Sequence, residues 1–241
     1  MDKNVYVLDK EVTSVDTDFN LDVKLSSLFL YFQEASSLAS EELHIGKKET
    51  IDKDLHWVIS RFNVEISRLP KYGDRLKVIT YPGDNNKVFF YRHFMIKDIN
   101  DNVLVRANSV WLIVDGKTRQ VKRDPFMGRE LPSIHLEEEL EVPSKINQTA
   151  SIPLYTKTIR YSDIDLNTHL NNTRYIELIQ DAFDLEFYKT HKIKSFNINY
   201  NAEFKVGDEV SVYTSNSNPV IVSGRKDDKE HFVASLEFKK I

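Results

Sequence analysis

The amino-acid sequence predicts an α+β protein made of two copies of one unit, each a long helix packed against an antiparallel sheet. Two observations support this prediction. The two halves of the chain align with each other, and in each half a stretch with helical spacing of apolar residues is followed by strand-like segments. Successive strands without helices between them pair in an antiparallel sheet, which buries one face against the helix.

The internal repeat is clearest where each half begins its helix. Residues 16–35, DTDFNLDVKLSSLFLYFQEA, align without a gap with residues 163–182, DIDLNTHLNNTRYIELIQDA. Residues 62–80 align with residues 196–214 in the same way, and the longer connection between the two blocks lies in the first copy. Both copies therefore contain a D-x-D-x-N turn, then a helix, then strands.

Periodicity places the helices and strands. In the first helix, apolar residues recur at the spacing of a buried stripe: Leu25, Leu28, Phe29, Phe32, Ala35, Ala39 and Leu43. In the helix that follows His169, the corresponding residues are Tyr175, Ile176, Ile179, Ala182 and Phe183. Alternation in FNVEI (62–66) and FNINY (196–200) predicts strands, and the Gly-Asp pair before the next strand suits a tight turn.

The D-x-D-x-N turn has a structural explanation. Asp and Asn before a helix accept hydrogen bonds from its first backbone N–H groups, at roughly 0.5–2 kcal/mol per cap. Because both copies carry the pattern, we interpret it as part of a shared scaffold.

Between the copies lies a segment rich in proline with an acidic run, which is typical of a connection between domains. We expect an N-terminal domain at residues 1–128, a linker at residues 129–152 and a C-terminal domain at residues 153–241.

Composition limits the function classes. A chain of 241 residues with 41% hydrophobic and 29% charged residues can bury two domain cores. The absence of Cys excludes a thiolate nucleophile, a disulfide and a Cys-ligated metal. The net charge of −4 leaves no basic footprint, so nucleic-acid binding is not expected. Apolar runs are too short for a membrane span and the first residues lack a signal pattern, so we expect a cytoplasmic protein with no membrane partner.

Two positions distinguish the second copy from the first. His169 aligns with Asp22, and Glu203 aligns with Leu69. A helix cap does not require His, since an imidazolium would oppose the helix dipole, although a single His is most often structural. Next to Asp165 and Asn167, the His and the carboxylate form a set that suits hydrolysis: bases, an amide that orients water or substrate, and helix-start N–H groups for an oxyanion.

Other site types find no support in the sequence. No G-x-S-x-G, H-E-x-x-H, P-loop or G-x-G-x-x-G pattern is present, and the remaining His residues lack metal-ligand spacing. We therefore expect neither a cofactor nor a metal.

The chain resembles the acyl-acyl carrier protein (ACP) thioesterases, the bacterial relatives of the plant plastid enzymes. The family's D-x-N-x-H-x-N-N stretch stands at residues 165–172, and its Tyr-x-x-Glu before a Gly-Asp turn stands at residues 200–208. In the first half, HWVISRFNVEISRLPKYGD and ANSVWLIVDGKTRQ resemble the family's strand block and its Ser-x-Trp strand. The first residues show no Ser-rich, Arg-rich pattern like the plant members' transit extension, so we do not expect plastid import.

The resemblance implies a tandem double hotdog fold and hydrolysis of fatty acyl-ACP to free fatty acid in fatty acid biosynthesis. The implied catalytic residues are Asp165, Asn167, His169 and Glu203. A Cys-His-Asn triad is impossible without Cys. Two mechanisms stay open: His169 and Glu203 activate a water that attacks the thioester, or Asp165 is the nucleophile and forms an anhydride.

The first copy lacks the His and the Glu, so we expect it to hold the acyl chain, with Phe29 and Phe32 as candidate substrate-binding residues; plain core is the alternative. Acyl carrier protein is acidic, and KTRQVKR (117–123) is the densest basic cluster for docking, although a solvated loop explains it equally well. A homodimer is compatible with this organisation. Alternative functions are an acyl-CoA thioesterase, an enoyl-thioester hydratase and a non-catalytic module that binds acyl thioesters.

Overall fold

The computed structural model describes residues 3–137 and 139–241, which form two compact units. Unit 1 comprises Met1–Val23 and Leu30–Pro143, and unit 2 comprises Lys24–Phe29 and Ser144–Ile241. The first residues of the long helix α1 are thus counted with unit 2, and the expected linker divides between the two units.

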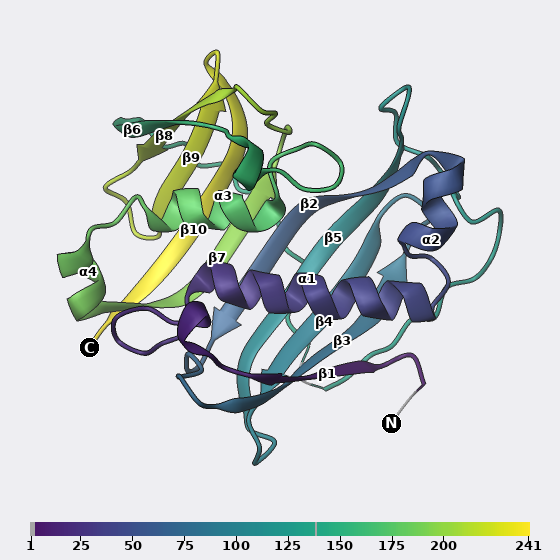
Figure 1. Cartoon of the computed structure of the whole chain (residues 1–241), viewed down its shortest axis with the longest axis horizontal. Coiled ribbons are helices and arrows are strands. Elements are labelled where there is room, and N and C mark those ends of the chain that lie inside the picture. Colours follow the sequence, from purple (N-terminus) through teal and green to yellow (C-terminus); the bar gives the residue numbers. More distant parts are fainter. Residues whose placement is uncertain (1–2, 138) are drawn as a thin grey trace. The chain divides into compact units, whose positions relative to one another are not determined.

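Unit 1 is a curved antiparallel sheet with the strand order β1-β3-β4-β5-β2 (Figure 1). Its strands are β1 (Tyr6–Glu11), β2 (Leu55–Ile66), β3 (Arg75–Asn85), β4 (Phe90–Lys97) and β5 (Val103–Asp115). Its helical elements are the 3₁₀ turn η1 (Ser14–Asp16), the major part of α1 (Leu25–Glu42), the short helix α2 (Lys47–Thr50) and the 3₁₀ turn η2 (Ile51–Lys53). The expected strands at residues 62–66 and 76–80 are confirmed as parts of β2 and β3.

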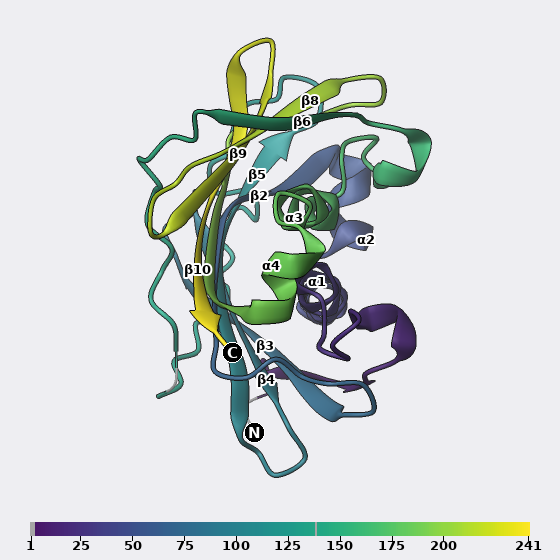
Figure 2. The same cartoon turned by 90° about the vertical axis from the view of Figure 1, so that its left-hand side faces the viewer.

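The helix α1 buries the predicted apolar stripe as far as Ala39, whereas Leu43 follows the helix end at Glu42 and is half-buried. Leu28, Phe32, Ala35 and Ala39 are at most 3% exposed, whereas Leu30 on the opposite face is 49% exposed. The Phe32 ring lies 5.6 Å from the Phe62 ring of β2 and 4.9 Å from the Phe94 ring of β4, centroid to centroid. The curved strands of unit 1 therefore pack around this part of α1 (Figure 2).

Unit 2 repeats the plan with the strand order β7-β10-β9-β8-β6, again antiparallel. Its strands are β6 (Ile152–Thr158), β7 (His191–Tyr200), β8 (Glu209–Thr214), β9 (Val220–Lys226) and β10 (Lys229–Lys240). Its helical elements are the 3₁₀ turn η3 (Tyr161–Asp163) and the helices α3 (Asn172–Gln180) and α4 (Leu185–Thr190).

The helix after His169 is shorter than its apolar pattern predicts. The helix α3 ends at Gln180, so Ala182 and Phe183 lie outside it. Asp184 then caps α4 by accepting a hydrogen bond from the Phe187 N–H at 2.8 Å. Phe183 is half-buried and packs against Phe187 and Phe238, with centroids 4.8 Å and 4.9 Å away, so its apolar position in the pattern reflects aromatic packing after the helix has ended.

The internal repeat is matched at the level of backbone hydrogen bonds. Val12 N–H donates to the Asp74 carbonyl at 2.9 Å, and Ile159 N–H donates to the Asp208 carbonyl at 2.9 Å. The predicted Gly-Asp turns contain Gly73 at φ +82° and Gly207 at φ +88°, a left-handed conformation that glycine adopts without a steric penalty. The alignment of the two halves therefore pairs residues with the same structural role. No helix in the described part of the chain has the length and apolar character needed to cross a membrane.

Candidate active site

A tight loop between η3 and α3 carries three of the predicted site residues. The Asp165 carboxylate Oδ1 accepts hydrogen bonds from the N–H groups of Asn167 at 2.8 Å and His169 at 3.4 Å. The Asp165 N–H donates to the His169 carbonyl at 2.8 Å. Thr168 adopts φ +64°, which reverses the chain between them. Asp165 thus organises the loop that presents Asn167 and His169.

The expectation that D-x-D-x-N caps the following helix is wrong. The helix α3 starts at Asn172, and its cap is Asn171, whose Oδ1 accepts from the Thr173 N–H at 3.0 Å. Bridge pairing of Ile164 with Leu170 folds residues 165–169 back into a separate loop. The carboxylate of Asp165 therefore satisfies N–H groups of that loop instead of the helix start.

Glu203 lies in the turn that follows β7, which ends at Tyr200. The Leu170 N–H donates to the Phe204 carbonyl at 2.9 Å, and His169 forms an antiparallel bridge with Lys205. These backbone contacts hold the turn against the Asp165 loop.

The two residues that distinguish the second copy meet in space. His169 Nε2 lies 3.3 Å from Glu203 Oε2, and the two side chains are 17% and 33% exposed. The imidazole and the carboxylate therefore form a partly buried pair that can still meet a substrate.

The first copy has the same loop with different chemistry. Asp18 Oδ1 accepts from the N–H groups of Asn20 at 2.8 Å and Asp22 at 3.2 Å. Asp22 bridges with Lys71, and the Lys71 Nζ lies 3.5 Å from Asp22 Oδ1. The loop is therefore a shared scaffold, on which the first copy carries an ion pair and the second a His–Glu pair.

Seven of the N–H groups around the helix start, the expected oxyanion donors, already have acceptors within unit 2. The N–H groups of Asn167, Thr168, His169, Leu170 and Asn171 all donate to Asp165, Phe204 or Asp163. Those of Thr173 and Arg174 donate to the Asn171 side chain and carbonyl. In this arrangement, these N–H groups are not available to a substrate oxygen.

Phe29 and Phe32, the candidate substrate-binding residues, are buried against other rings. Phe29 is 4% exposed and its ring centroid lies 5.5 Å from that of Phe196. Phe32 is 1% exposed in the aromatic cluster of unit 1. Their role in binding an acyl chain stays a prediction.

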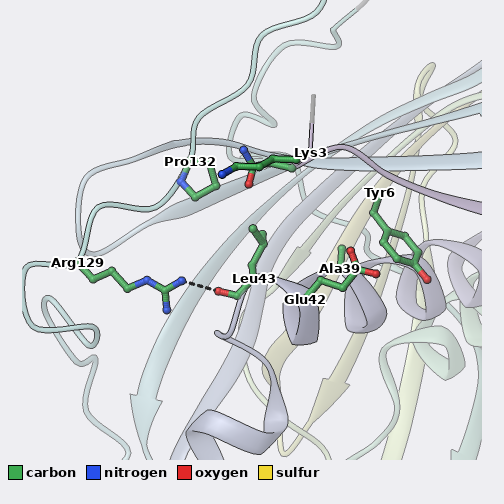
Figure 3. Close-up of a pocket in the computed structure, with 8 residues that line it drawn as sticks. Lys3, Tyr6, Ala39, Glu42, Leu43, Arg129 and Pro132 are labelled. Atoms are coloured by element: carbon green, nitrogen blue, oxygen red, sulfur yellow. Dashed lines mark hydrogen bonds between the residues drawn. The ribbon is translucent and has the colours of Figure 1, made fainter. Parts of the chain in front are cut away.

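Two cavities in unit 1 are lined by other residues. One of about 300 Å³ lies between the start of the chain, the end of α1 and the segment after β5, and Arg129 Nη2 donates there to the Leu43 carbonyl at 2.8 Å (Figure 3). Another of about 370 Å³ is lined by the outer side of α1 and Asp16. Neither cavity includes the His–Glu pair.

Three further residues lie in or against the turn that carries Glu203, and the sequence did not indicate them as site residues: Tyr175, Phe204 and His231. The signal for the first two was present in the alignment, where Leu28 and Pro70 stand opposite them.

Within the described residues, no group of three or more His, Asp or Glu side chains is arranged to hold a metal ion.

The two helix-and-sheet units define a double hotdog protein. Models of the acyl-ACP thioesterase N-terminal and C-terminal domains match residues 3–125 and 147–238, so the chain belongs to the acyl-ACP thioesterase family. The resemblance seen in the sequence is confirmed.

Solved structures agree with this family. The chain superposes on an acyl-ACP thioesterase from Bacteroides thetaiotaomicron with a TM-score of 0.86 at 26% identity, covering 98% of both chains. A 12:0-ACP thioesterase from Umbellularia californica shares the fold, with a TM-score of 0.83 at 20% identity over 100% of this chain and 99% of the other.

Plant relatives match only part of the chain. The chloroplastic palmitoyl-acyl carrier protein thioesterase of Cuphea hookeriana is 29% identical over 164 residues, or 64% of this chain. The matched part spans 40% of that relative's length.

Proposed function

We propose that this protein hydrolyses fatty acyl-ACP to free fatty acid and carrier protein in fatty acid biosynthesis. The observation that carries the proposal is the His169–Glu203 pair at 3.3 Å, at positions where the first copy has Asp22 and Leu69. A fold requirement alone would not place a general base with a carboxylate partner in one copy only. Membership of the acyl-ACP thioesterase family supports the substrate class.

In the proposed mechanism, water attacks the thioester carbonyl carbon. We assign His169 the tautomer with its proton on Nε2, 3.3 Å from Glu203 Oε2, so that the carboxylate orients the ring and Nδ1 takes a proton from water. The C–S bond then breaks, the carrier thiol receives the proton, and the fatty acid leaves. Asp165 holds the loop, and the Asn167 amide is our proposed donor to the carbonyl oxygen, since the neighbouring N–H groups are occupied.

The alternative chemistry makes Asp165 the nucleophile. Attack by its carboxylate would expel the thiol and form an anhydride, which water would open. Two hydrogen bonds from backbone N–H groups to Asp165 Oδ1 favour the structural role, because they stabilise the carboxylate and reduce its nucleophilicity. Single-turnover hydrolysis in ¹⁸O-water tests this point: label in the Asp165 carboxylate would contradict direct attack by water.

In this proposal the two copies have different roles. We propose that the N-terminal domain, residues 1–128, holds the acyl chain and that the C-terminal domain, residues 153–241, carries the catalysis, with residues 129–152 as the linker. The exposed basic cluster of Lys117, Arg119, Lys122 and Arg123 is the proposed docking surface for the acidic carrier. A cytoplasmic location and a homodimer stay predictions.

The deciding experiment measures release of fatty acid from acyl-ACP and from acyl-CoA of the same chain length. We expect turnover of acyl-ACP by the wild-type protein and its loss in H169A. Binding of acyl-ACP without release of fatty acid would contradict the proposal and favour a binding module. Turnover of acyl-CoA but not of acyl-ACP would show that the substrates are coenzyme A thioesters.

A further inference from the structure

The turn that carries Glu203 is held by a hydroxyl outside the predicted catalytic set. The Tyr175 hydroxyl of α3 lies 3.4 Å from the Ala202 carbonyl oxygen and 3.3 Å from the Phe204 nitrogen. It donates to the carbonyl and accepts from the N–H, and Glu203 is the residue between these two contacts. The hydroxyl therefore fixes the backbone on both sides of Glu203.

Tyr175 is built to stay in place and to keep its proton. Its side chain is 3% exposed, and its ring lies 5.2 Å, 5.8 Å and 5.5 Å from the rings of Tyr200, Phe204 and Phe232. Burial raises the pKa of Tyr175, so the hydroxyl remains a hydrogen-bond donor.

His231 of β10 supports the same turn from its other side. Its carbonyl accepts hydrogen bonds from the N–H groups of Asn201 at 2.8 Å and Ala202 at 3.1 Å. Its ring stacks on Phe204 with centroids 4.2 Å apart and planes inclined by 23°. Phe204 thus contacts the rings of both His231 and Tyr175.

The first copy keeps the backbone part of this arrangement. There the Leu104 carbonyl accepts from the N–H groups of Ser67 at 3.0 Å and Arg68 at 3.3 Å, as the His231 carbonyl does in the second copy. Leu104 is therefore the counterpart of His231.

The first copy lacks the side-chain part. Leu28 aligns with Tyr175 and has no hydroxyl, and Pro70 aligns with Phe204 and has no N–H. Both partners of the hydrogen bond are thus present in the copy with Glu203 and absent from the copy with Leu69. A bond needed only for the fold would be expected in both.

We propose that Tyr175 is a positioning residue that holds Glu203 against His169. This inference rests on the proposed function. The carboxylate can orient the imidazole only if the turn keeps its distance from the Asp165 loop, and a displacement of about 1 Å in a site of this kind can cost up to ~100-fold in rate. Tyr175 acts through Glu203 and has no contact with the reacting atoms in this proposal.

The test is a double-mutant cycle on acyl-ACP turnover with Y175F, E203Q and the double variant. Y175F removes only the hydroxyl, and we expect kcat to fall about tenfold with KM unchanged. In the E203Q background, Y175F should cause no further loss, because its effect passes through the Glu203 carboxylate. The matched control is Y188F, which removes a hydroxyl that donates to the Gln180 carbonyl at 2.9 Å in the same unit and should leave kcat unchanged.

Amide hydrogen exchange supplies a readout that needs no substrate. The Phe204 N–H should exchange about fivefold faster in Y175F than in the wild type, and at the wild-type rate in Y188F. Unchanged exchange in Y175F, or a kcat loss that persists in full in the E203Q background, would overturn the inference. If the wild-type protein turned over no acyl thioester, the proposed function would fall instead, so the two failures are distinguishable.

Discussion

His169 Nε2 and Glu203 Oε2 lie 3.3 Å apart, on a loop and a turn that are joined by backbone hydrogen bonds. The equivalent loop and turn of the first copy are joined in the same way but bring Asp22 to Lys71. The first copy therefore provides an internal control for the second. A substitution in the shared loop can be made in both copies, whereas a substitution of the His–Glu pair can be made only in the second copy.

We expect H169A and E203Q each to lower kcat for acyl-ACP by about 10²–10⁴-fold, since each removes a member of the proton-transfer pair. Thermal unfolding should stay close to that of the wild type, because both side chains are partly exposed. The matched control is D22N, which disrupts the ion pair of the first copy and should leave turnover per folded molecule unchanged. Wild-type kcat in the H169A/E203Q double variant would contradict the site assignment.

Asp165 and Asp18 allow the loop to be tested apart from the chemistry. Asn keeps one oxygen that can accept the N–H groups of the loop, so D165N and D18N should have similar unfolding midpoints. We expect kcat to fall about 100-fold in D165N, because the negative charge beside His169 that would stabilise the protonated imidazole is lost, and to be unchanged in D18N, where no His is present. Equal kcat in both variants would show that the Asp165 charge has no part in the reaction.

The basic cluster should affect carrier-linked substrates alone. Charge reversal at Arg119, Lys122 and Arg123 should raise KM for acyl-ACP by about tenfold at low salt, with a smaller effect at high salt. Turnover of a small acyl thioester should be unchanged. Charge reversal at the exposed residues Lys239 and Lys240 is the control, and equal KM values in the two variants would remove the docking surface.

The buried imidazole of His231 leads us to expect a lower free energy of unfolding in mild acid. Burial, the largest cause, lowers the pKa of His231 below its ordinary value of 6.5, and it outweighs a hydrogen bond with the Glu203 backbone, which raises that pKa. The unfolded chain therefore takes up a proton before the folded chain does, and stability falls as pH drops below about 6.5 towards the lowered pKa. Chemical denaturation at pH 7 and pH 5 measures this fall.

The variant H231L should weaken the acid effect, because Leu104 shows that Leu fits the equivalent position. Part of the fall should remain, since burial also lowers the pKa of His93. The control H44Q changes an exposed His, with a side chain 74% exposed, and should keep the wild-type dependence. An equal fall in H231L and in the wild type would contradict this role of His231.

The sequence by itself determined the repeat, the buried stripe of α1, the strands at the aligned blocks and the choice of His169 and Glu203 as the residues that differ between copies. These features depend on local periodicity and residue type, which a linear pattern records. The Gly-Asp turns were predictable for the same reason, because a left-handed φ strongly favours glycine at Gly73 and Gly207.

Only the tertiary structure decided how the site is assembled. In the structure, the Asp165 carboxylate of the D-x-D-x-N pattern belongs to a separate loop and does not cap the helix. Glu203 lies in a turn beyond β7, and Tyr175 and His231 contact that turn. These contacts join residues on α3, β10 and the turn after β7, which lie far apart in the chain. Their distances depend on how strands and helices pack, and no periodicity in the sequence encodes that packing.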